Sequence, residues 1–374
     1  MSETVEQLSA RSLPLAELHR RHGATFAERD GRLLPAHYGD AAAEYEAVRG
    51  GGAGLCDLSA RGRIEVSGAE AVQFLNGLVT NDVKALAPGA WMNAAFPNVQ
   101  GRLLALARVV RPGDAATFLF DTEAATHLRV HQNLARFTLA GDFRVRDLTA
   151  ETAQLSLQGA QTAALVGRLL GAEAARVERR RAAVVSWQAQ PLTLLRATHT
   201  AEDGFDLIAS VDVLTRLWPA LVAAGAQPVG CDALEVLRVE AGVPRYSVDM
   251  TEANVVVEAA PEDAVSYTKG CYVGQEIIAR IHWRGHVAKR LTGLLCDDAR
   301  AVAPEARISS ADGREIGRVT SAVFSPRLAR AVALGYVKYD YLAPGTEVRV
   351  GDEGRTAHVA ELPLVRGGWW AEQA

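Results

Sequence analysis

The sequence predicts an α+β protein in which two units of mixed strands and helices precede a small all-β domain. Three observations indicate this class. From residue 61 to residue 137, the patterns follow in the order strand, helix, paired strands, helix. A second unit of this kind occupies residues 154–242, and after residue 288 the chain reads as short strands separated by Asp-Gly, Pro-Gly and Gly-Asp turns. This order is typical of a split α+β layer and not of a doubly wound parallel sheet.

The first unit is defined by its hydrophobic periodicity. RGRIEVSG (61–68) alternates polar and apolar residues, as a half-buried strand does. Apolar residues at helical spacing follow at Val72, Leu75, Leu78 and Val79. A turn at NVQG (98–101) joins two strands into a hairpin, TFLFD adds another strand, and a helix over 123–137 completes the unit.

The second unit begins with the strand QLSLQG (154–159) and a helix that follows it directly. AAVVSWQ, LTLLRAT and GFDLIAS predict three further strands. The helix over 211–225 contains Pro219, which predicts a kink or a break because proline cannot donate the helical hydrogen bond. A short helix over 231–242 ends at a glycine, the residue type suited to a left-handed C-cap.

The composition is that of an ordinary globular protein, with 374 residues, 49% hydrophobic and 22% charged. A net charge of −4 gives no strong field toward nucleic acid or an anionic membrane, so we expect neither as a direct partner. No stretch approaches the roughly 20 apolar residues of a membrane span, and the first residues lack the apolar core of a signal peptide. We therefore expect a cytoplasmic protein whose first dozen residues are disordered.

The four cysteines form no CxxC motif and have no accompanying histidine cluster, so the sequence predicts neither a disulfide framework nor a metal site. Three of them stand beside apolar residues, as structural cysteines do. Cys271 differs, because in KGCYVGQE (269–276) it lies between two glycines, close to Lys269 and shortly before a helix. A helix N-terminus and a neighbouring ammonium both stabilise a thiolate. Spacing alone leaves two alternatives open, a reactive thiol and a small residue that fills a gap beside a turn.

The segment KGCYVGQEIIAR resembles the signature of the YgfZ family, which are folate-binding proteins related to the glycine-cleavage T-protein. An eight-residue motif with Lys, Gly, Cys, Gly, Gln and Glu in place is far more specific than a lone glycine pattern. Further segments that resemble the same superfamily are residues 47–89, 199–207, 237–250 and 284–294. The resemblance therefore covers nearly the whole chain.

This resemblance implies three lobes around a central cavity that holds tetrahydrofolate, with a small β-barrel at the C-terminal end. The expected regions are a partly disordered N-terminal segment (1–34), a folate-binding region (35–285) and the barrel (286–374). Members of the family assist the assembly or repair of four-iron iron–sulfur clusters, and the motif cysteine that they require is Cys271 here. Lys269 would tune this thiol. The implied partners are folate and iron–sulfur client enzymes or assembly proteins.

A tetrahydrofolate-dependent aminomethyltransferase is the second alternative within this superfamily. T-proteins place an aspartate pair after the glycine turn of the hairpin, where a carboxylate can orient a folate nitrogen or take up its proton. The matching positions are Ala105 and Leu106, and no Asp or Glu occurs from 90 to 113. Leu234 likewise stands where T-proteins have an arginine. The resemblance therefore favours an assembly factor over an enzyme, and a non-catalytic folate-binding regulator of tRNA modification is a third alternative.

Glu202 is the main candidate for folate binding. In TAEDGFD (200–206) it matches the acid that contacts the pterin in T-proteins, and a carboxylate can accept two hydrogen bonds from the pterin edge. An acidic turn before a strand remains the alternative. Further candidates for the folate site are Gln100, Gly101, Asn81 and Arg238. For Arg238, an ion pair with Glu240 at the helix end is the competing interpretation.

Overall fold

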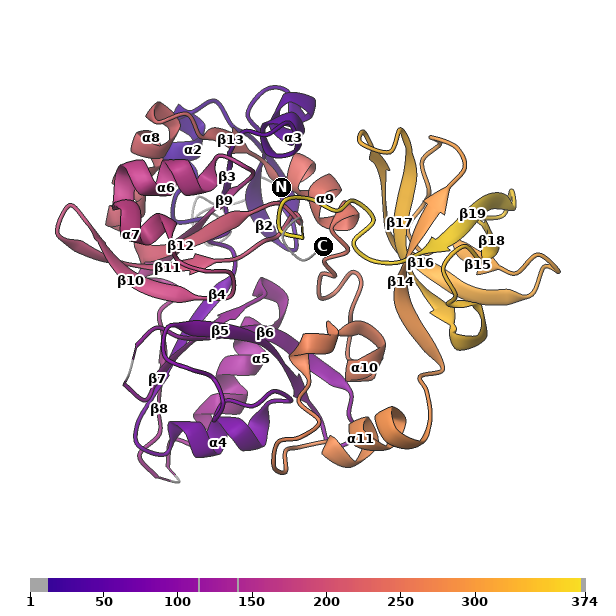
Figure 1. Ribbon diagram of the computed structural model, residues 1–374, viewed down its shortest axis with the longest axis horizontal. Coiled ribbons are helices and arrows are strands. Elements are labelled where there is room, and N and C mark those ends of the chain that lie inside the picture. The colour runs from indigo at the N-terminus through magenta and orange to yellow at the C-terminus, as the bar shows by residue number, and fades with distance from the viewer. Residues whose placement is uncertain (1–12, 114, 140, 371–374) are drawn as a thin grey trace, which may run out of the picture.

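The computed structural model describes residues 13–113, 115–139 and 141–370, so the disorder predicted for the first dozen residues lies outside the described part. Three lobes surround a common centre (Figure 1). Two sheet-and-helix lobes lie one above the other, and a barrel lies beside them. The predicted three-lobed α+β class with a C-terminal barrel is confirmed.

Lobe 1 contains a five-stranded antiparallel sheet in the order β5-β6-β7-β4-β8. Its strands are β4 (Gly62–Ser67), β5 (Ala90–Pro97), β6 (Leu103–Arg111), β7 (Thr117–Thr122) and β8 (Arg144–Asp147). Helices α4 (Ala71–Leu78) and α5 (Ala124–Ala135) pack on one face, because their apolar stripes meet the alternating apolar side chains of the strands. The strands, hairpin and helices predicted between residues 61 and 137 are all present.

Lobe 2 contains a six-stranded sheet in the order β10-β11-β12-β9-β3-β13. Its strands are β3 (Gly54–Asp57), β9 (Thr152–Gln158), β10 (Ala182–Trp187), β11 (Gln190–Arg196), β12 (Gly204–Ser210) and β13 (Gln227–Val229). Strand β3 precedes lobe 1 in the chain and the other five follow it, so lobe 1 is inserted between β3 and β9. Only β13 runs parallel to its neighbour, β3.

Six helices among the described residues belong to lobe 2. They are α2 (Ala16–Arg21), α3 (Ala41–Arg49), α6 (Thr162–Leu170), α7 (Ala172–Ala175), α8 (Val211–Ala223) and α9 (Cys231–Glu240). Helix α8 continues through Pro219, so the break that proline could have caused does not occur. Residues 13–34, part of the segment for which partial disorder is predicted, form α2 and begin the hairpin of β1 (Thr25–Arg29) and β2 (Arg32–His37).

A bridging segment leads from lobe 2 past lobe 1 to the barrel (Figure 1). It contains α10 (Val256–Ala259), a short 3-10 turn and α11 (Gln275–Arg284). The barrel is closed in the order β14-β17-β16-β15-β18-β19. Its strands are β14 (Lys289–Cys296), β15 (Arg307–Ser309), β16 (Glu315–Ser325), β17 (Arg330–Lys338), β18 (Glu347–Val350) and β19 (Arg355–Ala360). In the described ranges, every helix is too short or too polar to cross a bilayer.

Candidate functional site

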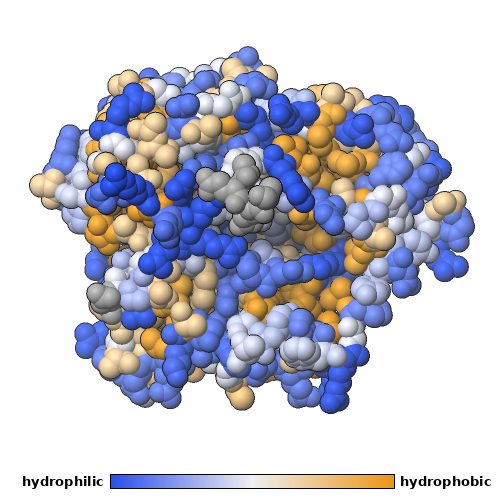
Figure 2. All heavy atoms as spheres, viewed as in Figure 1, coloured by the Kyte–Doolittle hydropathy of each residue, from blue (hydrophilic) through white to orange (hydrophobic). Residues whose placement is uncertain are grey.

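The face viewed in Figure 2 is hollowed near its centre, where the three lobes meet. The candidate residues divide into two groups around this centre. One group lies where the bridging segment packs on lobe 1 and includes Cys271, Lys269, Asn81, Gln100 and Gly101. The other lies where lobe 2 meets the barrel and the C-terminal segment, and includes Glu202 and Arg238.

Cys271 lies in the loop that leads into α11, and its side chain is exposed, whereas Cys56 and Cys296 are buried. The loop is fixed at Gly274, which has a positive φ of 77° and caps the N-terminus of α11. A Cβ at this position would overlap the Asn98 carbonyl of the β5–β6 turn, so only glycine fits. A thiol in this position is accessible to a second molecule and stands near the positive end of a helix dipole.

Lys269 occupies a different environment from its neighbour Cys271. Its ammonium is largely buried and donates to the carbonyls of Asn76, Val79 and Asn81 at 2.7, 2.8 and 2.7 Å. These carbonyls belong to the C-terminal end of α4 and the turn after it, where helix geometry leaves acceptors without partners. Burial lowers the pKa of Lys269 to about 8. The ammonium thus anchors the cysteine loop to lobe 1 and is directed at the helix end.

Asn81 joins lobe 1 to the bridging segment. Its side-chain amide donates to the carbonyls of Asn93 and Asp263 at 2.8 and 2.7 Å, and its oxygen accepts from the Asp82 N–H at 2.9 Å. Both ends of the side chain are therefore engaged within the protein. Asn81 helps to position the segment that carries Lys269.

The hairpin turn of lobe 1 packs against α11. Gly101 has a φ of 69°, and a Cβ there would lie 3.3 Å from side-chain atoms of Ile277 and Ile278. Gln100 next to it is exposed and donates its backbone N–H to the Asn98 side chain at 2.9 Å. These contacts place the hairpin turn beside Gly274 and α11, next to the Cys271 loop.

Glu202 lies in the turn before β12, with only 14% of its side chain exposed. One carboxylate oxygen accepts from the Arg49 guanidinium at 2.9 Å. The other accepts from the Gly368 backbone N–H at 2.7 Å. An isolated acidic turn on the surface would have neither partner, so Glu202 belongs to a constructed polar site.

Arg238 is held by partners on α9, in the segment after α9 and in the barrel. It bonds to Glu235 at 2.9 and 2.5 Å, to Asp249 at 2.6 Å and to the Ser321 hydroxyl at 2.6 Å. The ion-pair interpretation therefore describes its environment, although the partner is not Glu240. Glu240 instead accepts from Tyr45, Arg49 and Ser325. Arg238 fastens lobe 2 to the barrel.

A buried ionic cluster at the seam of lobes 1 and 2 was missed by the sequence analysis. Asp206 of β12 is fully buried and lies 2.5 Å from Arg108 of β6 and 3.0 Å from His199. Burial alone would raise the pKa of Asp206, but the charges of His199 and Arg108 outweigh it and hold the pKa well below its usual range. The sequence feature that could have revealed this cluster is the aspartate inside the apolar strand GFDLIAS.

The two positions where T-proteins carry their aspartate pair hold apolar side chains packed into hydrophobic cores. Ala105 is fully buried in the core of lobe 1, and Leu106 on the opposite face of β6 packs on the core between lobe 1, the bridging segment and the barrel. Neither side chain can accept a proton or pair with a cation.

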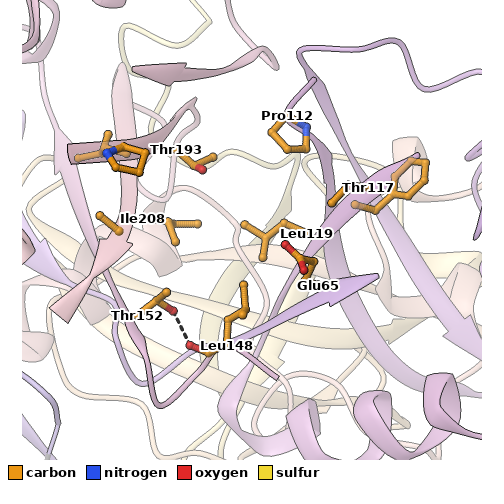
Figure 3. Close-up of a pocket in the computed structure, with 12 residues that line it drawn as sticks. Glu65, Pro112, Thr117, Leu119, Leu148, Thr152, Thr193 and Ile208 are labelled. Atoms are coloured by element: carbon orange, nitrogen blue, oxygen red, sulfur yellow. Dashed lines mark hydrogen bonds between the residues drawn. The ribbon is translucent and has the colours of Figure 1, made fainter. Parts of the chain in front are cut away.

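A cavity of about 210 Å³ lies apart from both groups, between the sheets of lobes 1 and 2. Glu65 and Leu119 from lobe 1 and Thr193 and Ile208 from lobe 2 point toward the same space (Figure 3). None of the candidate residues lines this cavity. It is a gap in the packing of the two sheets and does not include the thiol or Glu202.

Two α+β lobes and a closed C-terminal barrel define a class of protein, the T-protein-like class. The model of the GCVT N-terminal domain matches residues 15–269, and that of the glycine cleavage T-protein C-terminal barrel domain matches residues 289–365. The chain belongs to the glycine cleavage T-protein family.

Similar proteins cover nearly the whole chain. An aminomethyltransferase of Saccharopolyspora erythraea is 31% identical over 96% of this chain and 99% of its own length. One of Geobacillus kaustophilus is 32% identical over 94% of this chain and 98% of its own length. The crystal structure of glycine cleavage system aminomethyltransferase T from Bartonella henselae superimposes with a TM-score of 0.86 at 26% identity, over 95% of this chain and 98% of that one.

Proposed function

We propose that this protein is a YgfZ-type member of the T-protein family, a folate-binding factor that assists the assembly or repair of four-iron iron–sulfur clusters through Cys271. The observation that carries the proposal is the exposed thiol in KGCYVGQE, on a loop fixed by Lys269 and Gly274. A packing cysteine would be buried, as Cys56 and Cys296 are. An accessible thiol can bind iron, accept sulfur or take up a one-carbon unit from a partner.

Tetrahydrofolate is the cofactor that membership in this family supports, and it supplies a carrier for one-carbon units. Glu202 fits its pterin edge, because a carboxylate offers about four lone pairs and only two of them are used by Arg49 and Gly368. The two that remain can accept the paired N–H groups of an aminopyrimidine. In this proposal Glu202 holds and orients the pterin.

An aminomethyltransferase is the second candidate, favoured because relatives that are 31% and 32% identical are aminomethyltransferases by name. The transfer needs a group that orients the folate nitrogen and takes up its proton. Ala105 and Leu106 cannot do either, and the rest of the hairpin contains no acid. We therefore place this activity second, and a non-catalytic regulator of tRNA modification third.

A rescue experiment tests the proposal. The gene is deleted in its host, and enzymes that need four-iron clusters are assayed beside enzymes that do not. The deletion strain then receives the wild-type chain, Cys271→Ser, or Cys231→Ser as a matched control at a half-buried cysteine. We expect the wild-type chain and the control to restore the cluster enzymes, and Cys271→Ser to fail although it folds.

Three other results would favour another function or contradict the assembly role. Full rescue by Cys271→Ser together with failure of Glu202→Gln would favour the folate-binding regulator. Purified protein that transfers an aminomethyl group from its lipoyl carrier to tetrahydrofolate would establish the aminomethyltransferase. Cluster enzymes that are unaffected by the deletion would contradict the assembly role.

A further inference from the structure

The C-terminal segment returns from the barrel to lobe 2 and touches Glu202. The Val365 N–H donates to the Glu240 carbonyl at 3.0 Å, and the Trp369 N–H donates to the Ala201 carbonyl at 3.1 Å. Trp369 is 6% exposed, and the Arg179 guanidinium lies 5.3 Å from the centre of its indole ring. Residues 365–370 are thus docked on lobe 2 by backbone bonds and by a buried aromatic side chain.

Two parts of the chain that are far apart in sequence each donate a hydrogen bond to the Glu202 carboxylate. Arg49 comes from the end of α3, and its side chain is 3% exposed and also bonds to Glu240 at 3.0 Å. Glu240 is itself fixed by Tyr45 and by Ser325 of the barrel. The Gly368 N–H approaches the other Glu202 oxygen from the C-terminal segment. With a donor on each oxygen, the plane of the carboxylate is set by the protein before any ligand arrives.

The docked segment requires glycine where it passes Glu202. A Cβ on Gly367 would overlap a Glu202 carboxylate oxygen and the Ala201 carbonyl. At Gly368 a Cβ would lie 3.3 Å from the second carboxylate oxygen, which is tighter than an ordinary contact but less severe than the overlap at Gly367. Any side chain at Gly367 must therefore push the carboxylate away from its present position.

We propose that Gly367 and Gly368 are positioning residues of the folate site, which hold the Glu202 carboxylate in the orientation that a pterin edge needs. This inference rests on the proposed folate-binding function and assigns a role to the C-terminal segment in it. The Gly368 N–H orients one oxygen, Arg49 orients the other, and the absence of a side chain at Gly367 leaves the space that the carboxylate occupies.

The test measures binding of two ligands by calorimetry under anaerobic conditions. Tetrahydrofolate carries the pterin edge, whereas p-aminobenzoylglutamate shares its tail and lacks the pterin. We expect Gly367→Ala to bind tetrahydrofolate at least tenfold more weakly and p-aminobenzoylglutamate as the wild-type chain does. Gly113→Ala is the matched control, because a Cβ there would meet no atom within 4 Å. A chain truncated after Val365 should also bind tetrahydrofolate at least tenfold more weakly, since it lacks the Gly368 N–H.

Hydrogen exchange on the wild-type chain gives a readout that depends on no variant. Tetrahydrofolate should slow exchange at the Gly368 and Trp369 amides, because a ligand on Glu202 stabilises the carboxylate that Gly368 donates to. Unchanged affinity of Gly367→Ala, or unchanged exchange in 366–370, would overturn the positioning role alone. Tighter binding by the truncated chain would also overturn it, since the segment would then cover the site. A wild-type chain that does not bind tetrahydrofolate would overturn the folate proposal and this role with it.

Discussion

Replacement of Lys269 by methionine tests how the cysteine loop is held. The change keeps most of the apolar stem and removes the ammonium, which donates to three carbonyls at 2.7–2.8 Å. A hydrogen bond from a charged donor contributes about 1.5–3 kcal/mol, and a buried carbonyl left without a donor costs about 1–3 kcal/mol. The desolvation of the ammonium, visible in its lowered pKa, offsets part of this. We expect the free energy of unfolding to fall by about 2–4 kcal/mol.

Urea unfolding followed by tryptophan fluorescence measures this loss. Lys84→Met is the matched control, because Lys84 is exposed and the same chemical change there should alter stability by less than about 0.5 kcal/mol. Alkylation by iodoacetamide adds a second observable. If Lys269 anchors the loop, Cys271 in Lys269→Met reacts at least as fast as in the wild-type chain; if the ammonium tunes the thiolate, the reaction slows. A variant as stable as the wild-type chain would refute the anchoring argument.

Three further predictions concern single positions. Gly274→Ala should lose at least about 2 kcal/mol of stability in thermal unfolding, because φ at this position is positive and the new Cβ would overlap the Asn98 carbonyl. Gly270→Ala is the control and should leave stability unchanged, because a Cβ there would meet no atom within 4 Å. Asp206→Asn should cost about 3 kcal/mol by breaking a buried ion pair. Folding lowers the pKa of Asp206, so the stability that its charge contributes is complete above the ordinary pKa of 3.8 and is lost as the pH falls through the lower folded value. Below about pH 4, the thermal midpoint of the wild-type chain should therefore fall with pH, and that of Asp206→Asn should change less. Mass spectrometry after brief iodoacetamide treatment should find Cys271 labelled and Cys56 unlabelled; equal labelling would contradict the exposures of the two thiols.

Local pattern predicted much of this fold. The alternation in RGRIEVSG, the helical spacing that follows it and the turn at 98–101 each produced the expected element, because neighbouring residues decide these structures. Strands β3 and β13 were not predicted. They are four and three residues long, and they become strands only by pairing with each other and, for β3, with β9. Such pairing depends on residues far away in the chain.

The candidate site likewise combines features that local sequence predicts with features that depend on distant residues. The position of Cys271 on a loop before a helix could be inferred from its immediate neighbours, since glycines and a following helix are local signals. The partners of Lys269 lie up to 193 residues away, and those of Glu202 lie 153 and 166 residues away on α3 and in the C-terminal segment. No periodicity relates such positions. The role of Lys269 as an anchor, and the role of Gly368 as a donor, required the folded chain.

The insertion of lobe 1 between β3 and β9 has a consequence for synthesis on the ribosome. Lobe 1 is complete once residue 147 has left the exit tunnel, and its first and last strands, β4 and β8, pair with each other. Lobe 2 begins earlier in the chain yet cannot complete its sheet until β13, at residues 227–229, has emerged. Since domains generally fold as units during translation, the inner lobe should fold first and bring the two halves of the outer lobe together.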